Sequence, residues 1–173
     1  MDEPVEITDH DPHYEGRYRA ERDRVRLGLA TASLKFEHIG STAVPGLAGK
    51  PIVDLMLGAS PTVWAAVEEL RPRVVALGYE DLGEAGVPGR ISFRKRTALR
   101  AFNLVLVEED GVLWRDNLAL RDYLRTHPDE AAKYAEAKRA AIASGATTLL
   151  AYSAAKADLL AVLLKKARVR ESE

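Results

Sequence analysis

Residues 38–55 of this 173-residue chain read HIGSTAVPGLAGKPIVDL, and this stretch decides the fold. At its start, Leu34–Ile39 alternates apolar and polar residues, which predicts a half-buried strand. Residues 42–50 hold a proline and two glycines, which predict a loop or one irregular turn. Residues 51–57 are apolar except for Asp54, which predicts a central strand covered on both faces. A strand, a tight bend and a second strand therefore follow one another.

The remaining elements follow from hydrophobic periodicity and from the positions of proline and glycine. Amphipathic spacing predicts a first helix from Tyr14 to about Ala32, and Pro61 opens a second one that extends to about Leu77. The glycine-rich residues 80–90 are expected to form a loop. Two further strands and three C-terminal helices are expected at Ile91–Lys95, Ala101–Val107, Val112–Thr126, Asp129–Ala143 and Thr147–Val169.

This order predicts an α/β (α+β) fold, with a small mixed β-sheet, flanking helices and a helical C-terminal portion. The length suits one domain over residues 1–173, with a sheet-containing part at about 13–109 and a helical part at about 110–170.

Composition excludes several classes of protein. The chain has no cysteine, so disulfides, thiolate metal sites and a cysteine nucleophile are excluded. A net charge of −1 argues against a general nucleic-acid binder, and we expect no long nucleic acid as partner. The acidic N-terminus lacks the pattern of a signal peptide, and no apolar run is long enough to span a bilayer. We therefore expect a cytoplasmic protein that does not contact membranes; its oligomeric state stays open.

The chemistry of the chain is expected between the bend and the second strand. Gly40 permits close approach of a phosphate to the backbone, and Ser41 and Thr42 offer hydroxyl and N–H donors. Asp54 is a lone acid in an apolar strand, which is costly unless the acid is paired or bound to metal. Mg²⁺ is bound by one or two carboxylates together with substrate phosphates. Lys50, which with Pro51 leads into the strand, lies near the same mouth and is a candidate for phosphate contact. The alternatives are a structural turn, an Asp54 satisfied by backbone N–H groups or by Lys50, and a solvated Lys50.

The run from His38 to Asp54 resembles, without a gap, the hallmark of the GrpB family, a branch of the nucleotidyltransferase superfamily. Nearly the whole chain shares the resemblance, through Trp114, residues 121–128, Tyr134 with Lys138, and Tyr152 with Lys156. It implies the small mixed sheet of nucleotidyltransferases. At superfamily level it also implies transfer of a nucleotidyl group from a nucleoside triphosphate, assisted by metal ions held by carboxylates.

The metal-binding pattern departs from the superfamily. Nucleotidyltransferases usually carry a second acid two residues after the first, where this chain has Met56. The GrpB pattern carries a His-x-His pair on a later strand, where this chain has Asn103 and Val105. An amide coordinates metal weakly and a valine cannot coordinate it. We expect Asp54 as the catalytic residue and as a metal ligand, with Asn103 as a weak second ligand.

Basic residues later in the chain are further candidates for phosphate contact. Alternation places Arg94 and Arg96 on one strand face, with Lys95 on the other, and Arg121 lies on a helix. Each could bind a triphosphate or remain a solvated surface charge. The Tyr-Lys pairs at 134/138 and 152/156 are interpreted as core packing with snorkelling lysines.

The sequence thus supports a leading hypothesis and two rivals. The leading hypothesis is a Mg²⁺-dependent nucleotidyltransferase that uses a nucleoside triphosphate and a small-molecule acceptor. The first rival is a binding module for a nucleotide or metabolite that has lost its metal ligands. The second is an enzyme of different chemistry that reuses the pocket.

Overall fold

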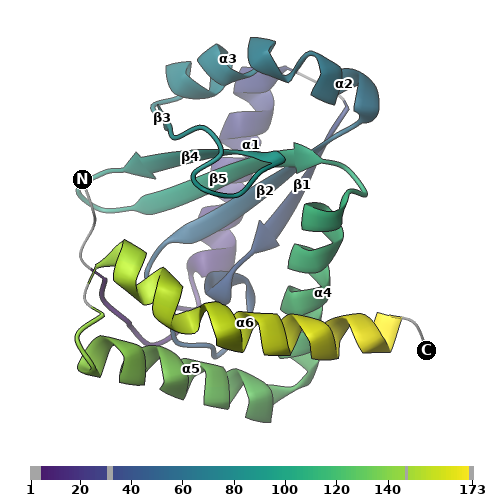
Figure 1. The fold of residues 1–173 in the computed structure, drawn as a ribbon. Helices are drawn as coiled ribbons and strands as arrows, with labels where there is room; N and C mark the ends of the chain where they lie inside the picture. Colours follow the sequence, from purple (N-terminus) through teal and green to yellow (C-terminus); the bar gives the residue numbers. More distant parts are fainter. Residues whose placement is uncertain (1–4, 31–32, 147, 172–173) are drawn as a thin grey trace.

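The computed structural model describes residues 5–30, 33–146 and 148–171 of the chain. Its centre is a five-stranded sheet with the strand order β1-β2-β5-β4-β3 (Figure 1). The strands are β1 (Leu34–Ile39), β2 (Val53–Ala59), β3 (Glu80–Asp81), β4 (Arg90–Arg96) and β5 (Ala101–Glu108). The central strands β2 and β5 run parallel, whereas every other neighbouring pair is antiparallel. The predicted small mixed sheet is confirmed.

One face of the sheet packs on the N-terminal helix α1 (Tyr14–Leu29) and on the short helices between β2 and β3. These are α2 (Pro61–Ala65), the 3₁₀ turn η2 (Val67–Glu69) and α3 (Arg71–Ala76). Side chains alternate along a strand, so every second residue of the central strands points into this core. The strands contribute buried Leu55, Leu57, Leu104, Leu106 and Phe93.

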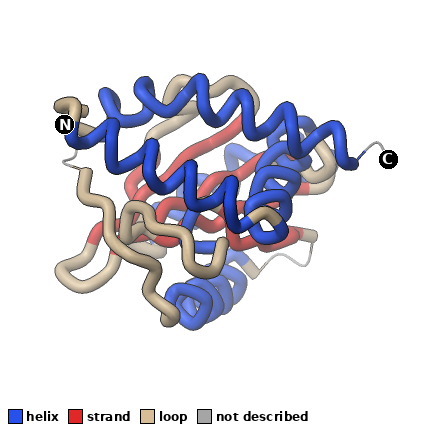
Figure 2. The backbone as a smooth tube through the Cα atoms, turned by 90° about the horizontal axis from the view of Figure 1, so that it is seen from below, coloured by secondary structure: helices blue, strands red, loops and turns tan. Residues whose placement is uncertain are grey.

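The C-terminal helices α4 (Val112–Thr126), α5 (Pro128–Ala143) and α6 (Leu149–Glu171) pack against one another. Trp114 of α4 lies directly on the sheet, where a side chain at Gly58 would come within 2.6 Å of its ring. The helices α5 and α6 lie side by side across the end of the sheet that carries the β1–β2 loop (Figures 1 and 2). Their apolar side chains enclose Val44, Leu47 and Ala48 of that loop. The loop is therefore covered by helices from the far end of the chain.

Two expectations about elements were wrong. The single helix expected at 61–77 is broken into α2, η2 and α3. Pro72 lacks an N–H group and clashes with a preceding helical turn, so it occurs in the first turn of α3, where no donor is needed. Residues 80–90 were expected to form only a loop, yet Glu80–Asp81 forms β3 by pairing with Phe93 and Arg94. That pairing partner is distant in sequence.

The helix ends are close to the predicted ones. The first helix ends at Leu29, and its expected end at Ala32 lies outside the described residues, as does Thr147, the expected start of the last helix. The fifth helix begins at Pro128, one residue before the expected start. Within the described part of the chain, every helix is too short or too polar to cross a membrane.

Candidate functional site

Asp54 lies against the bend that follows β1. The pairing register places Ile39, Asp54 and Asn103 opposite one another on neighbouring strands. Gly40 has a φ of +74°, and any Cβ built on it would fall well inside 3.0 Å of the Asp54 Oδ2 atom. Only glycine combines this backbone conformation with such close approach of a carboxylate. The acid of the strand and the Gly-Ser bend, 13 residues apart in sequence, thus form one site.

Asn103 and Arg96 hold the other carboxylate oxygen of Asp54 in place. The Asn103 side-chain amide donates to Asp54 Oδ1 over 2.7 Å. Arg96 donates to the Asn103 Oδ1 atom over 3.0 Å and to the Phe102 carbonyl over 2.7 Å. Because a guanidinium can only donate, the Asn103 oxygen must face Arg96 and its NH₂ group must face Asp54. In this arrangement Asn103 is a donor to the carboxylate, and its oxygen is not directed at a metal ion beside Asp54.

The loop between the bend and β2 folds back on the bend. Ser41 and Thr42 begin a short 3₁₀ turn, η1 (Ser41–Ala43). A Cβ built on Gly49 would clash with the Ser41 hydroxyl, so the two loop segments touch at this point. Gly49 also pairs with Thr8 of the N-terminal segment in an isolated β-bridge. This closure places Lys50, the next residue, 5.9 Å from the ring centroid of Tyr152 on α6.

Two lysines from the C-terminal helices complete the site. The Lys138 side chain on α5 is 2% exposed, donates to the Ala48 carbonyl, and lies 4.3 Å from the ring centroid of Tyr134. Lys156 on α6 lies 4.8 Å from the ring centroid of Tyr152. The interpretation of Lys138 as a snorkelling lysine was wrong, because its ammonium group is directed into the protein.

The ammonium groups weaken one another's affinity for protons. Burial lowers the pKa of Lys138 to about 7, and the nearby positive charges of Lys156, Arg139 and Lys50 act in the same direction. Burial and the charge of Lys50 lower the pKa of Lys156 to about 8, although Asp54 opposes the shift. Lysines from a loop and from two helices therefore lie near one another, and Lys156 is also near enough to Asp54 for the carboxylate to raise its pKa. An anion between these lysines would relieve the repulsion between their charges.

Two of the arginines proposed to bind phosphate are engaged by carboxylates of the protein itself. Arg94 donates to Glu80 on β3 over 2.6 Å. Arg121 donates to Glu37 over 2.6 Å and to the His38 carbonyl over 3.1 Å, and so ties α4 to β1. Arg96 differs, because it reaches Asp54 through Asn103. The expected separation of faces also holds, since Lys95 pairs with Glu21 of α1 on the opposite face of the sheet.

The donor set fits one magnesium ion but not the pair used by many nucleotidyl-transferring enzymes. Across residues 5–30, 33–146 and 148–171, no three His, Cys, Asp or Glu side chains gather as a metal-ligand set. Two residues after Asp54, Met56 pairs with Val105, so apolar side chains occupy the place of a second ligand. One carboxylate together with substrate phosphates and water can hold a single Mg²⁺. Asp54 is the residue that would do so.

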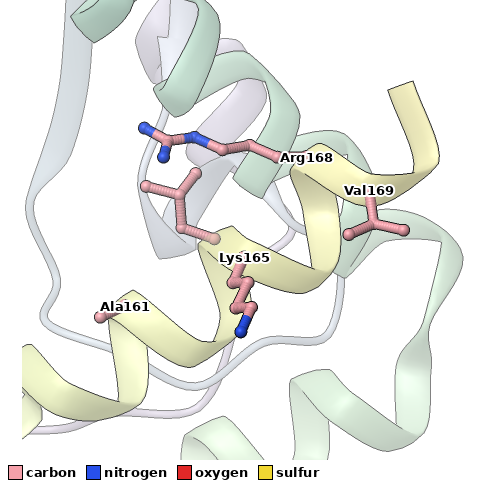
Figure 3. Close-up of a pocket in the computed structure, with 5 residues that line it drawn as sticks. Ala161, Lys165, Arg168 and Val169 are labelled. Carbon is pink, nitrogen blue, oxygen red and sulfur yellow. The ribbon is translucent and has the colours of Figure 1, made fainter. Parts of the chain in front are cut away.

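A shallow depression on the outer part of α6 is a separate feature (Figure 3). Its lining residues come from α6 alone and include none of the side chains grouped around Asp54; they are Ala161, Leu164, Lys165, Arg168 and Val169. Arg168 in this group is paired with Asp116 of α4 over 2.8 Å. We therefore place the candidate site at the bend, not at this depression.

The family described as GrpB protein matches residues 4–166 of the chain. This chain belongs to the GrpB family. A UPF0157 protein of Pseudomonas aeruginosa is 34% identical over an alignment of 174 positions, which covers 96% of this chain and 69% of that protein. The crystal structure of the conserved protein GrpB from Enterococcus faecalis is similar with a TM-score of 0.85 and 26% identity, over 97% of this chain and all of that one.

Relatives in this family differ in length. UPF0157 protein YqkA of Bacillus subtilis is 32% identical over 135 residues, which are 78% of this chain but only 39% of that protein. This chain thus spans well under half the length of YqkA. The family resemblance seen in the sequence, from the bend to Asp54 and on to the C-terminal helices, is confirmed by these matches.

Lys138 and Lys156 are the site residues that sequence reasoning missed. Both follow a tyrosine by four residues, in Tyr134-x₃-Lys138 and Tyr152-x₃-Lys156, so each pair lies on one helix face. The repetition of that spacing on two helices was the available signal. The spacing does not tell whether the lysines face solvent or the loop, and the packing of α5 and α6 decides this.

Proposed function

We propose that this GrpB-family chain binds a nucleoside triphosphate at the bend and transfers its nucleotidyl group to a small-molecule acceptor. The observation that carries the proposal is the grouping of Lys50, Lys138 and Lys156 beside the bend, with Lys156 near Asp54 and Lys138 near Gly49, which contacts Ser41. Buried cations from separate elements cost folding free energy, so a fold that gathers them favours an anionic ligand. A triphosphate carries enough negative charge to neutralise the group.

The parts of the site suggest separate tasks. The Gly40–Ser41 bend receives one phosphate group through backbone N–H and the Ser41 hydroxyl. Gly40 contributes by leaving room for the Asp54 carboxylate beside the bend. The lysines neutralise the other phosphates and the charge that develops on the leaving pyrophosphate. We assign to Asp54 the orientation of the acceptor hydroxyl for attack on the α-phosphorus, because its Oδ2 atom faces the bend. A Mg²⁺ ion held by Asp54 would supply additional charge neutralisation on the phosphates.

The acceptor is proposed to be a small molecule. The chain has 25 basic and 26 acidic residues, which gives no overall attraction for a long polyanion. Of its basic residues at the site, Lys138 is buried, and Lys50 and Lys156 are half-buried beside Tyr152 of α6, so they do not form an exposed stripe.

A binding module without turnover is the second candidate. The pairing of Met56 with Val105 favours it, because this pair removes the position at which a second metal ligand would lie. Such a module would keep the lysines and the bend, and would report the concentration of a triphosphate or another polyanionic metabolite.

Calorimetric titration of ATP with and without Mg²⁺, together with an assay for pyrophosphate release, distinguishes these candidates. Binding that strengthens with Mg²⁺ and is followed by pyrophosphate release supports the transferase. Binding that is indifferent to the metal, with no release, supports the module. If neither ATP nor another nucleoside triphosphate binds, the nucleotide proposal is wrong; thermal stabilisation by a different metabolite would then identify the ligand.

The Asp54→Asn variant tests the role of the carboxylate. Asparagine can still accept the hydrogen bond from Asn103, so we expect the fold to keep its stability or to gain slightly from the loss of a partly buried charge. Pyrophosphate release should fall by at least about a hundredfold, as it does when one electrostatic group of an active site is removed. Normal turnover by this variant would contradict the role given to Asp54.

A further inference from the structure

His38, the last but one residue of β1, connects the bend to α1. Its side chain is 4% exposed, and its ring stacks on Tyr18 with a centroid distance of 4.6 Å and an interplanar angle of 7°. The Nδ1 atom lies 3.1 Å from the Glu15 carboxylate, and the Nε2 atom lies 2.9 Å from the Thr42 hydroxyl. Both ring nitrogens are therefore used, one on α1 and one on the turn that follows Gly40 and Ser41.

These contacts determine which ring nitrogen carries the proton. A carboxylate only accepts hydrogen bonds, so Nδ1 carries a hydrogen and donates it to Glu15. In the neutral ring Nε2 is then an acceptor, and the Thr42 hydroxyl donates to it. Burial lowers the pKa of His38, and the charges of Glu15 and Asp54 oppose this only in part, while Arg125 adds to it. The lowered pKa favours the neutral ring.

The backbone around the bend is also held from α4. Arg125 donates to the Ala43 carbonyl over 2.8 Å, at the end of the turn. Arg121 donates to the His38 carbonyl over 3.1 Å, just before the bend. These bonds hold both ends of the segment, whereas the Thr42 side chain, itself 4% exposed, is held by His38. The bend is thus fixed from α1 and α4 before any ligand arrives.

We propose that His38 is a positioning residue. It accepts a hydrogen bond from the Thr42 hydroxyl and so keeps the Gly40–Ser41 bend in the shape that receives a phosphate group. This inference rests on the proposed function, since it assigns a role in the same site. Glu15 acts one step further away by fixing the ring tautomer that leaves Nε2 free to accept. A pre-shaped bend binds phosphate more tightly, because the ordering cost is met during folding.

Substitutions of Thr42 test the link without altering His38. Thr42→Val has nearly the same shape but lacks the hydroxyl, and Thr42→Ser keeps the hydroxyl. We expect the valine variant to bind ATP about tenfold more weakly, as for loss of one hydrogen bond to the bend, and the serine variant to bind within about twofold of the wild type. Thermal unfolding of each variant, followed by circular dichroism, controls for loss of folded protein.

Glu15→Gln tests the tautomer from an exposed position, so it remains informative if the valine variant unfolds. The Glu15 side chain is 50% exposed, and glutamine removes the charge that fixes the Nδ1–H tautomer. When the glutamine amide donates to Nδ1, the ring hydrogen moves to Nε2 and the Thr42 hydroxyl must turn from donor to acceptor. We expect weaker ATP binding by about threefold or more and a changed ¹⁵N chemical-shift pattern of the ring. Asp23→Asn, at an exposed acid on the same helix, is the matched control and should change neither quantity.

Wild-type-like ATP binding by both Thr42→Val and Glu15→Gln would overturn the proposal, as would losses that merely follow the loss of folded protein. If the wild type binds no triphosphate, the proposed function fails. The positioning of the bend is then judged by amide hydrogen exchange at Gly40 and Ser41. Faster exchange in Thr42→Val than in Thr42→Ser supports the role of His38, and equal exchange overturns it.

Discussion

Triphosphate binding should weaken as the pH rises, because the anion requires charged lysines. Burial lowers the pKa values of Lys138 to about 7 and of Lys156 to about 8. A bound polyanion stabilises the ammonium forms and raises both values, so binding takes up protons. Above its pKa, each lysine that must be charged reduces the affinity by up to about tenfold per pH unit. From about pH 7.5 to about pH 9.5 the affinity for ATP should therefore fall at least about tenfold.

Isothermal titration calorimetry measures this effect in two independent ways. Affinity is determined across that pH range, in which the charge of ATP is constant, and the enthalpy is compared in buffers of different ionisation enthalpy. The buffer dependence gives the number of protons taken up. Lys156→Met should bind more weakly at the lower pH and show a shallower pH dependence. Lys165→Met, which changes an exposed lysine on the same helix, is the matched control and should behave as the wild type.

A flat pH profile with no proton uptake would refute the reasoning, because it would mean that the lysines are already fully charged or do not meet the ligand. An unchanged profile in Lys156→Met, with a steep one in the wild type, would assign the effect to other groups.

Further predictions concern the stability of the site and its scaffold. Gly40→Ala combines a φ of +74° with a clash against Asp54, and should lower the free energy of unfolding in urea by about 1–3 kcal/mol or more. The Lys138 pKa is near 7 in the folded protein and about 10.4 when unfolded, so the unfolded chain binds more protons in between. Wild-type stability should thus rise between about pH 7 and about pH 10, and Lys138→Met should show a smaller rise, to which Lys156 with its pKa of about 8 still contributes. Burial raises the pKa of Glu21, but hydrogen bonds from Arg24, Lys95 and Tyr79 outweigh it and lower the pKa to about 2. Its stabilisation is present above the unfolded pKa of about 4.3 and is lost as the pH falls toward 2; Glu21→Gln should cost about 3 kcal/mol at pH 7 and much less in acid. Equal costs at the two pH values would disagree with this.

The sequence predicts a helix or strand well where residues adjacent in the chain determine it. Side chains of a strand point alternately to its two faces. The alternation in β1 therefore predicts a half-buried strand, and the apolar run in β2 predicts a strand covered on both faces. The break at Pro72 was also legible in principle, because a missing N–H is a property of the residue itself. The strand β3 could not be predicted from local sequence, because its two residues form a strand only by pairing with β4.

The sequence by itself determined the bend, the half-buried acid beside it and the family, because these reside in one continuous segment, His38 to Asp54. Tertiary structure alone decided which cations reach the acid. Lys138 and Lys156 are 84 and 102 residues beyond Asp54, and only the packing of α5 and α6 over the β1–β2 loop directs them inward. Tertiary structure also decided that Arg94 pairs with Glu80 and that Arg121 pairs with Glu37. A charge's partner depends on distances across the fold, and these are set by packing, not by spacing along the chain.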